Sequence, residues 1–107
     1  MAGTSLYSDT VGASAQVLLG KAVIVKDGMI FNNTAASAFL QLFDASSTTS
    51  VTLGTTVPYA IYAVSASDND SIRVGAGLQF FSGIVAASTT TTTGTTSAAT
   101  NVQLIVE

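Results

Sequence analysis

The stretch FLQLFDASSTTSVTLGTTVPYAIY, residues 39–62, decides the fold class of this chain. Two strongly apolar runs stand on either side of a segment made mostly of Ser, Thr and Gly, and the whole stretch has a single charged side chain. In an extended chain Phe39 and Phe43 fall on one face, while Leu40 and Leu42 fall on the other. Apolar residues on both faces are typical of a strand inside a sandwich or under a partner.

Short apolar runs separated by turn residues continue through the rest of the chain. Period-two alternation and β-branched residues predict strands, and no segment has a helical period with caps. The segments predicted to be extended are 11–17, 22–26, 29–31, 37–44, 51–53, 59–64, 71–74, 78–81, 84–87 and 102–106. The pattern of about eight short strands with frequent turns indicates an all-β fold, an antiparallel β-sandwich that is jelly-roll-like.

The most definite local prediction is a tight hairpin turn at Asp27-Gly28, between the runs 22–26 and 29–31. An Asp-Gly pair favours a two-residue turn because glycine accepts the positive φ that this turn requires. Further turns are predicted at Asp68-Asn69-Asp70 and at Gly75-Ala76-Gly77, from residues that commonly form them.

At 107 residues the chain has the length of one domain. Residues 1–10 lack strong alternation and are predicted to be an N-terminal arm, followed by a single β-sandwich domain over residues 11–107. The residues predicted to be mainly buried are Val23, Val25, Phe39, Phe43, Leu53, Ile61, Ile72, Leu78, Phe80, Ile84, Leu104 and Val106.

The composition argues against several classes of partner. Charged residues make up 8% of the chain, against about 25% in an ordinary domain. The charged residues are Lys21, Lys26, Arg73, Asp9, Asp27, Asp44, Asp68, Asp70 and Glu107, giving a net charge of −3. Three scattered cations do not form a footprint for phosphates, so we expect no nucleic-acid partner. We also expect no membrane partner and no signal peptide, because apolar runs are short and residues 1–10 have no basic or apolar region.

The chain offers little catalytic chemistry. It has no His and no Cys, and no serine stands in a G-x-S-x-G motif. We therefore predict that it is not an enzyme and that it has no catalytic, cofactor-binding or metal-site residues. One alternative is a Ca²⁺ site, since Asp68, Asn69, Asp70 and Ser71 resemble the start of an oxygen-rich loop. A solvated turn is favoured over that site, because the later ligands of such a loop are missing.

Two other polar features have a functional and a structural interpretation. Ser88–Thr100 is nearly all hydroxylated and could form an ice-binding array, but such arrays need Thr on several stacked strands. A strand extension followed by a long loop is favoured. Tyr7, Tyr59 and Tyr62 could stack on a sugar, but Tyr59 and Tyr62 fall on opposite faces of one strand, so packing in the core or an interface is favoured.

Four segments of the chain resemble a pattern found in small virion proteins of tailed bacteriophages. The segments are FLQLFD (39–44), VTLGTTVP (51–58), GLQFFSGIVAASTTTTTG (77–94) and VQLIVE (102–107). The most specific is V-T-L-G-T-T-x-P. The resemblance implies a β-sandwich structural protein of a phage particle, either a capsid decoration (cement) protein or a tail-associated component.

The resemblance and the composition together predict the function. We expect a decoration protein located in the virion and assembled in the host cytoplasm, with two partners: itself, as a homotrimer, and the major capsid protein. The alternatives are a tail or fibre component, or a carbohydrate-binding β-sandwich. The expected contact elements are the arm at residues 1–10 and the Ser88–Thr100 loop, with weak dependence on salt because charges are few.

Overall fold

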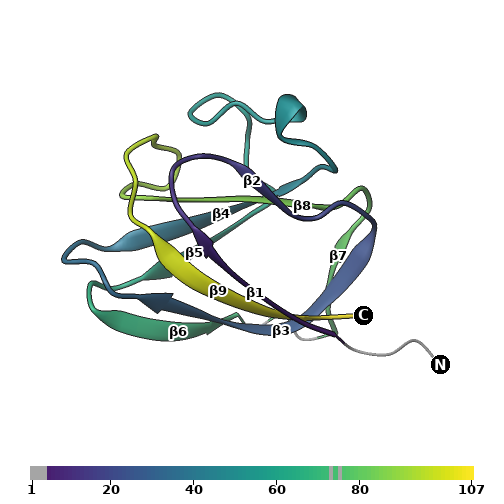
Figure 1. Ribbon diagram of the computed structural model, residues 1–107, viewed down its shortest axis with the longest axis horizontal. Helices are drawn as coiled ribbons and strands as arrows, with labels where there is room; N and C mark the ends of the chain where they lie inside the picture. Colours follow the sequence, from purple (N-terminus) through teal and green to yellow (C-terminus); the bar gives the residue numbers. More distant parts are fainter. Residues whose placement is uncertain (1–4, 73, 75) are drawn as a thin grey trace.

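The computed structural model describes residues 5–72, 74 and 76–107, and it is an all-β fold of two antiparallel sheets packed face to face (Figure 1). Short β-branched and apolar runs form most of the strands, as their propensity favours. The strands are β1 (Ser5–Val11), β2 (Gln16–Leu19), β3 (Val23–Asn32), β4 (Ala38–Asp44), β5 (Ala60–Val64), β6 (Asp68–Ile72), β7 (Leu78–Phe80), β8 (Ile84–Thr89) and β9 (Thr100–Val106). One 3-10 turn, η1 (Thr48–Ser50), lies between β4 and β5.

The strands pair in a nested order. Sheet A has the order β1-β9-β3-β6, with β7 also paired to β3, and sheet B has the order β2-β8-β4-β5. Consequently β4 pairs with β5, β3 with β6 and β7, β2 with β8, and β1 with β9. The first strand therefore pairs with the last, and the chain crosses between the sheets at each step except from β4 to β5 and from β6 to β7.

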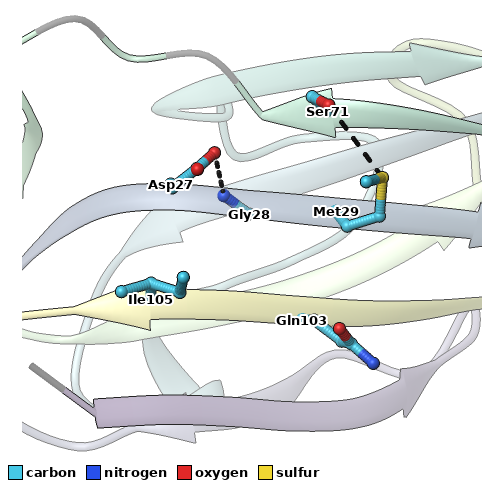
Figure 2. A pocket seen from close by; sticks show the side chains of 6 residues that line it. All are labelled: Asp27, Gly28, Met29, Ser71, Gln103 and Ile105. Atoms are coloured by element: carbon cyan, nitrogen blue, oxygen red, sulfur yellow. Dashed lines mark hydrogen bonds between the residues drawn. The ribbon is translucent and has the colours of Figure 1, made fainter.

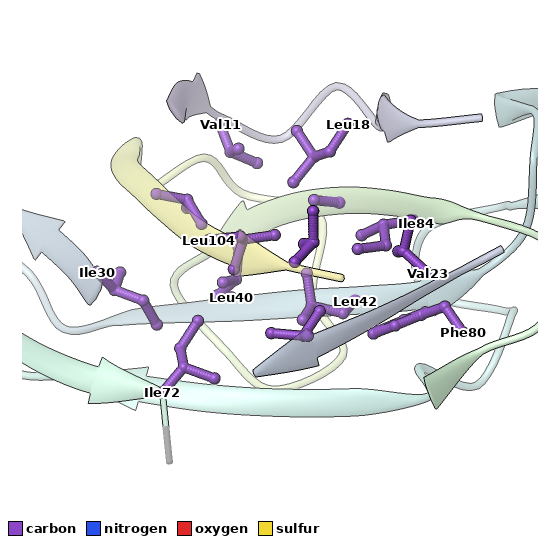
Figure 3. Packing of buried hydrophobic residues seen from close by; sticks show 14 of the residues in the cluster. Val11, Leu18, Val23, Ile30, Leu40, Leu42, Ile72, Phe80, Ile84 and Leu104 are labelled. Carbon is purple, nitrogen blue, oxygen red and sulfur yellow. The ribbon is translucent and has the colours of Figure 1, made fainter. Parts of the chain in front are cut away.

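The main core lies between the sheets (Figure 3). Alternate residues of each strand point inward, so side chains from both sheets meet there. The fully buried members are Val11, Val25, Leu40, Leu42, Ile72, Phe80, Ile84, Ala86, Val102 and Leu104. These apolar side chains account for the burial that stabilises a domain of this size.

A second, smaller cluster covers the outer face of sheet B. Phe43 and Val85 point away from the main core and pack with Ala45, Val51 and Leu53, which come from the segment after β4. Figure 1 shows this segment, with η1, on the side of sheet B that faces away from sheet A. Both faces of β4 are therefore apolar because both are buried.

The loop over sheet B also meets the threonine-rich loop between β8 and β9. A Cβ added at Gly54 would lie 3.3 Å from Cγ2 of Thr95, and Gly54 has a φ of +83°. Only glycine adopts that conformation without strain. The glycine in VTLGTTVP therefore has a physical role, since it lets the two loops pack side by side over the sheet.

The predicted hairpin at Asp27-Gly28 is wrong. Both residues lie inside β3, where Gly28 pairs with Ile72 on one side and Leu104 on the other. The irregularity is a β-bulge, because the register against β9 shifts between Val25 and Asp27. Gly28 is not among the glycines with positive φ. What glycine provides here is space, since a Cβ would lie 2.7 Å from the carbonyl oxygen of Gln103.

Four other local predictions are corrected. Residues 5–10 of the predicted arm belong to β1 and pair with β9, whereas residues 1–4 lie outside the described part of the chain. The predicted strand 11–17 is interrupted by a bend between β1 and β2. Residues 51–53 are loop, and the predicted turn at 68–70 belongs to β6. Neighbouring strands supply the pairing that makes polar segments such as 68–72 extended.

The predicted core is largely confirmed. Eight of its residues are buried: Val23, Val25, Phe43, Ile72, Phe80, Ile84, Leu104 and Val106. Phe39, Leu53 and Leu78 are partly buried. Ile61 is wrong, because it lies on the outer face of the edge strand β5 and is exposed.

Candidate interaction surface

The acidic pair that resembled the start of a calcium loop lies on the edge strand β6. Asp68 and Asp70 are exposed, and each accepts a hydrogen bond of 2.8 Å from the backbone N–H of the following residue. Among the described residues, three or more acidic side chains do not gather anywhere in an arrangement that could hold a metal ion. Charges on an edge strand discourage pairing with another chain, and this is the role that the geometry supports.

The two described tyrosine side chains are used in packing. The Tyr59 ring meets Phe80 edge-on, with centroids 5.1 Å apart and an interplanar angle of 63°. Its hydroxyl donates a hydrogen bond of 2.8 Å to the carbonyl oxygen of Gln79. Tyr62 packs against the main core, and burial raises the pKa of its hydroxyl. The Tyr7 side chain lies outside what the structure describes.

The hydroxyl-rich segment 88–100 consists of strand ends and a loop, as the favoured interpretation predicted. Its buried hydroxyls hold the loop to the sheet. Ser88 donates to the carbonyl oxygen of Ala98 at 2.6 Å, and Thr100 donates to Ser88 Oγ at 3.1 Å. The buried Gln41 amide donates to Thr89 Oγ1 at 2.7 Å. These hydroxyls satisfy buried polar groups rather than forming an exposed lattice.

The outer face of sheet A has a different character, because none of its described outward residues on β3, β6 and β9 is fully buried. Its outward residues on β3, β6 and β9 alternate with buried ones. These outward residues are Ile24, Lys26, Asp27, Met29, Phe31, Asn69, Ser71, Asn101, Gln103 and Ile105. Among the described residues of this face, charge is present only at the bulge, at Lys26 and Asp27. Most of this face is apolar or amide-bearing.

A shallow hollow of about 190 Å³ opens on this face beside the bulge (Figure 2). We call it the hollow, and it is lined by Asp27, Gly28, Met29, Ser71, Gln103 and Ile105. Ile105 and the Met29 thioether form the apolar part of its wall, Ser71 and Gln103 form a polar part, and the Asp27 carboxylate lies at the end nearest the bulge (Figure 2). Asp27 Oδ1 accepts a hydrogen bond of 2.8 Å from the Gly28 N–H.

A second feature is the exposed phenylalanine in the turn between β7 and β8. Phe81 is 68% exposed, although Phe80 beside it is completely buried. The Asp44 carboxylate accepts hydrogen bonds from Phe81 N at 3.0 and 3.1 Å and from Ser82 N at 2.8 Å. A Cβ added at Gly83 would lie 2.5 Å from the carbonyl oxygen of Leu19, so the two backbone segments are in close contact there. The turn therefore holds an exposed aromatic side chain on a fixed backbone.

Neither feature was identified from the sequence. The Phe80-Phe81 pair contained a usable signal, since adjacent residues of a strand point to opposite faces and one phenylalanine must leave the core. The hollow had no such signal, because it depends on the bulge and on three strands that are distant in the sequence.

Comparison with protein-family models, curated proteins and solved structures gave no match for this chain. Within the residues that the structure describes, no helix is long and apolar enough to cross a membrane.

Proposed function

We propose that this chain is a structural protein of a tailed-phage virion, a decoration protein that associates with itself and binds capsid subunits. It acts by being bound, and catalysis is not part of its role. The resemblance of four segments to small virion proteins is the reason for proposing that the particle is a phage virion. The physical support is the surface, and the single observation that carries the proposal is the outer face of sheet A, whose described residues are partly or largely exposed and carry charge only at the bulge.

That face suits contact with another protein because burying it desolvates few charged groups. Burial of an unpaired charge costs far more free energy than burial of an apolar side chain or of an amide that finds a hydrogen-bond partner. Residues 45–67 and 74–106 contain no charged residue at all. An ordinary solitary domain relies on interspersed surface charge to stay apart from its neighbours. A chain with this surface is better suited to an assembled state.

The nested strand pairing supports the jelly-roll description of the sandwich, since that fold is a long hairpin wrapped into two sheets. In the proposed role the loops packed on the outer face of sheet B give rigidity. The outer face of sheet A provides the contact area. A stable contact buries about 1,200–2,000 Å² in total. One sheet face together with an adjoining strand edge is of the right size.

Co-sedimentation with phage capsids that lack the chain tests this proposal. The purified protein should pellet with the capsids, and binding should change little between low and high salt, because few charges contribute. Phe31→Arg places a charge on the outer face of sheet A, outside the hollow, and should abolish binding. Thr48→Arg adds the same charge on the exposed η1 turn and should leave binding intact.

Three results would count against the proposal: no binding by the natural chain, loss of binding at moderate salt, or equal weakening by both substitutions. Copy number separates the capsid role from the tail alternative, since decoration requires hundreds of copies per particle and a tail position requires a few.

A further inference from the structure

We propose that the chain associates with itself by inserting Phe81 of one copy into the hollow on sheet A of the next. The inference deepens the proposed function, on which its self-associating part rests, by naming the two surfaces that meet. Both halves of the contact are present in one chain, at different places: the Phe81 side chain is largely exposed, and the hollow opens on the outer face of sheet A.

Phe81 has the properties of an interface anchor. Aromatic residues are enriched among the few side chains that contribute most of the binding energy. Its backbone is already held by the Asp44 carboxylate and by the close approach of the chain at Gly83. Binding then orders little more than one side chain, and preorganisation of this kind improves affinity by lowering the entropy cost.

The hollow has the size and chemistry for a phenyl ring. Its volume of about 190 Å³ admits one aromatic side chain. Met29 offers a thioether, and sulfur–aromatic contacts are favourable. Ile105 offers apolar surface, and the Asp27 carboxylate can face the positive edge of the ring. The hollow also lies on the nearly uncharged face, so little charge has to be desolvated when a second copy approaches.

The arrangement is heterologous, since a turn on one copy meets a sheet face on the next. Heterologous contacts generate closed rings when the rotation between copies closes, and filaments when it does not. The homotrimer expected from the sequence is such a ring. The contact at the hollow also occupies only part of sheet A, so surface remains for a capsid subunit.

Sedimentation velocity on the full chain, with two variants, tests the contact. Phe81→Ser removes the ring from an exposed position, so the fold should survive. Ser71→Tyr fills the hollow from an edge strand. We expect the natural chain to form oligomers, and we expect either variant to raise the dissociation constant at least about tenfold. Circular dichroism and melting temperature check that both variants fold. Val57→Ser, at another highly exposed apolar residue, is the control and should leave association unchanged.

Mixing the two variants gives the sharpest result. Phe81→Ser keeps an intact hollow, and Ser71→Tyr keeps an intact Phe81, so an equimolar mixture should form one-to-one dimers and nothing larger. A natural chain that stays monomeric at high concentration would overturn the inference, and so would variants that associate normally or a mixture that stays monomeric. An equal effect of Val57→Ser would also overturn it. Capsid binding by a monomeric chain would overturn the self-association and leave the capsid-binding part of the proposed function standing, so the two failures can be told apart.

Discussion

Gly28 shows how one missing side chain permits three strands to pack. A Cβ there would lie 2.7 Å from the Gln103 carbonyl oxygen and 3.1 and 3.2 Å from the side chains of Ile72 and Leu104. Gly28→Ala should therefore cost about 1–3 kcal/mol of unfolding free energy through overpacking. Urea unfolding measures this cost.

Gly20→Ala is the matched control for Gly28. At Gly20 an added Cβ would meet nothing closer than 3.9 Å, so the same substitution should leave the unfolding midpoint close to that of the natural chain. Equal effects at the two positions would contradict the close approach described for β3.

Asp44 is the second residue whose role is specific. Its carboxylate accepts from two backbone N–H groups of the turn that presents Phe81. Asp44→Ala should lower the unfolding free energy by about 1–3 kcal/mol, because those donors lose a charged acceptor. Asp68→Ala, where the carboxylate accepts only from the next residue, should cost much less. Thermal melting of both variants measures these losses of stability. An unchanged melting temperature for Asp44→Ala would show that the turn does not need the carboxylate as an acceptor.

At the scale of elements, β1 is the strand whose prediction changed most. It pairs with β9 along its whole length, from Ser5↔Val106 to Val11↔Thr100. Deleting residues 1–10 should therefore destabilise the sandwich, because β9 loses a neighbour and the core beside it opens. The expected result is a clearly lower melting temperature and increased binding of an apolar dye. An unchanged melting temperature would restore the view that these residues form a dispensable arm.

The turn after β7 permits a direct comparison of buried and exposed phenylalanine. Phe80→Ala should cost about 3–5 kcal/mol, since Phe80 is completely buried between the sheets. Phe81→Ala, one residue later and largely exposed, should cost less than about 0.5 kcal/mol. Chemical denaturation measures both values, and a reversed order would mean that β7 presents its other face to the core.

The elements also show what the sequence could predict. Strands such as β4 and β9, with strong alternation or apolar faces, were predicted close to their observed bounds, because burial of side chains is local information. Strands β1 and β6 are polar, and they are extended because β9 and β3 pair with them. Asp27-Gly28 has the composition of a turn, yet it forms a bulge because strands lie on both sides of β3. Pairing partners distant in the chain overrode the local preference in each case.

At the scale of the whole molecule, the distribution of charge is the main functional clue. The composition revealed the shortage of charge, but it could not reveal which face stays uncovered. That depends on two loops that bury the outer face of sheet B, whereas the outward residues of sheet A stay partly or largely exposed. The hollow likewise combines residues from β3, β6 and β9, whose contact follows only from the topology. The lack of His and Cys was readable from the residue types alone, whereas the surfaces were not.

The most direct test of the whole account is the number of copies of this chain per purified phage particle, measured by quantitative mass spectrometry against the major capsid protein. The account predicts hundreds of copies, in a fixed ratio to the capsid protein, retained after washing in high salt. Absence of the chain from purified particles would contradict it.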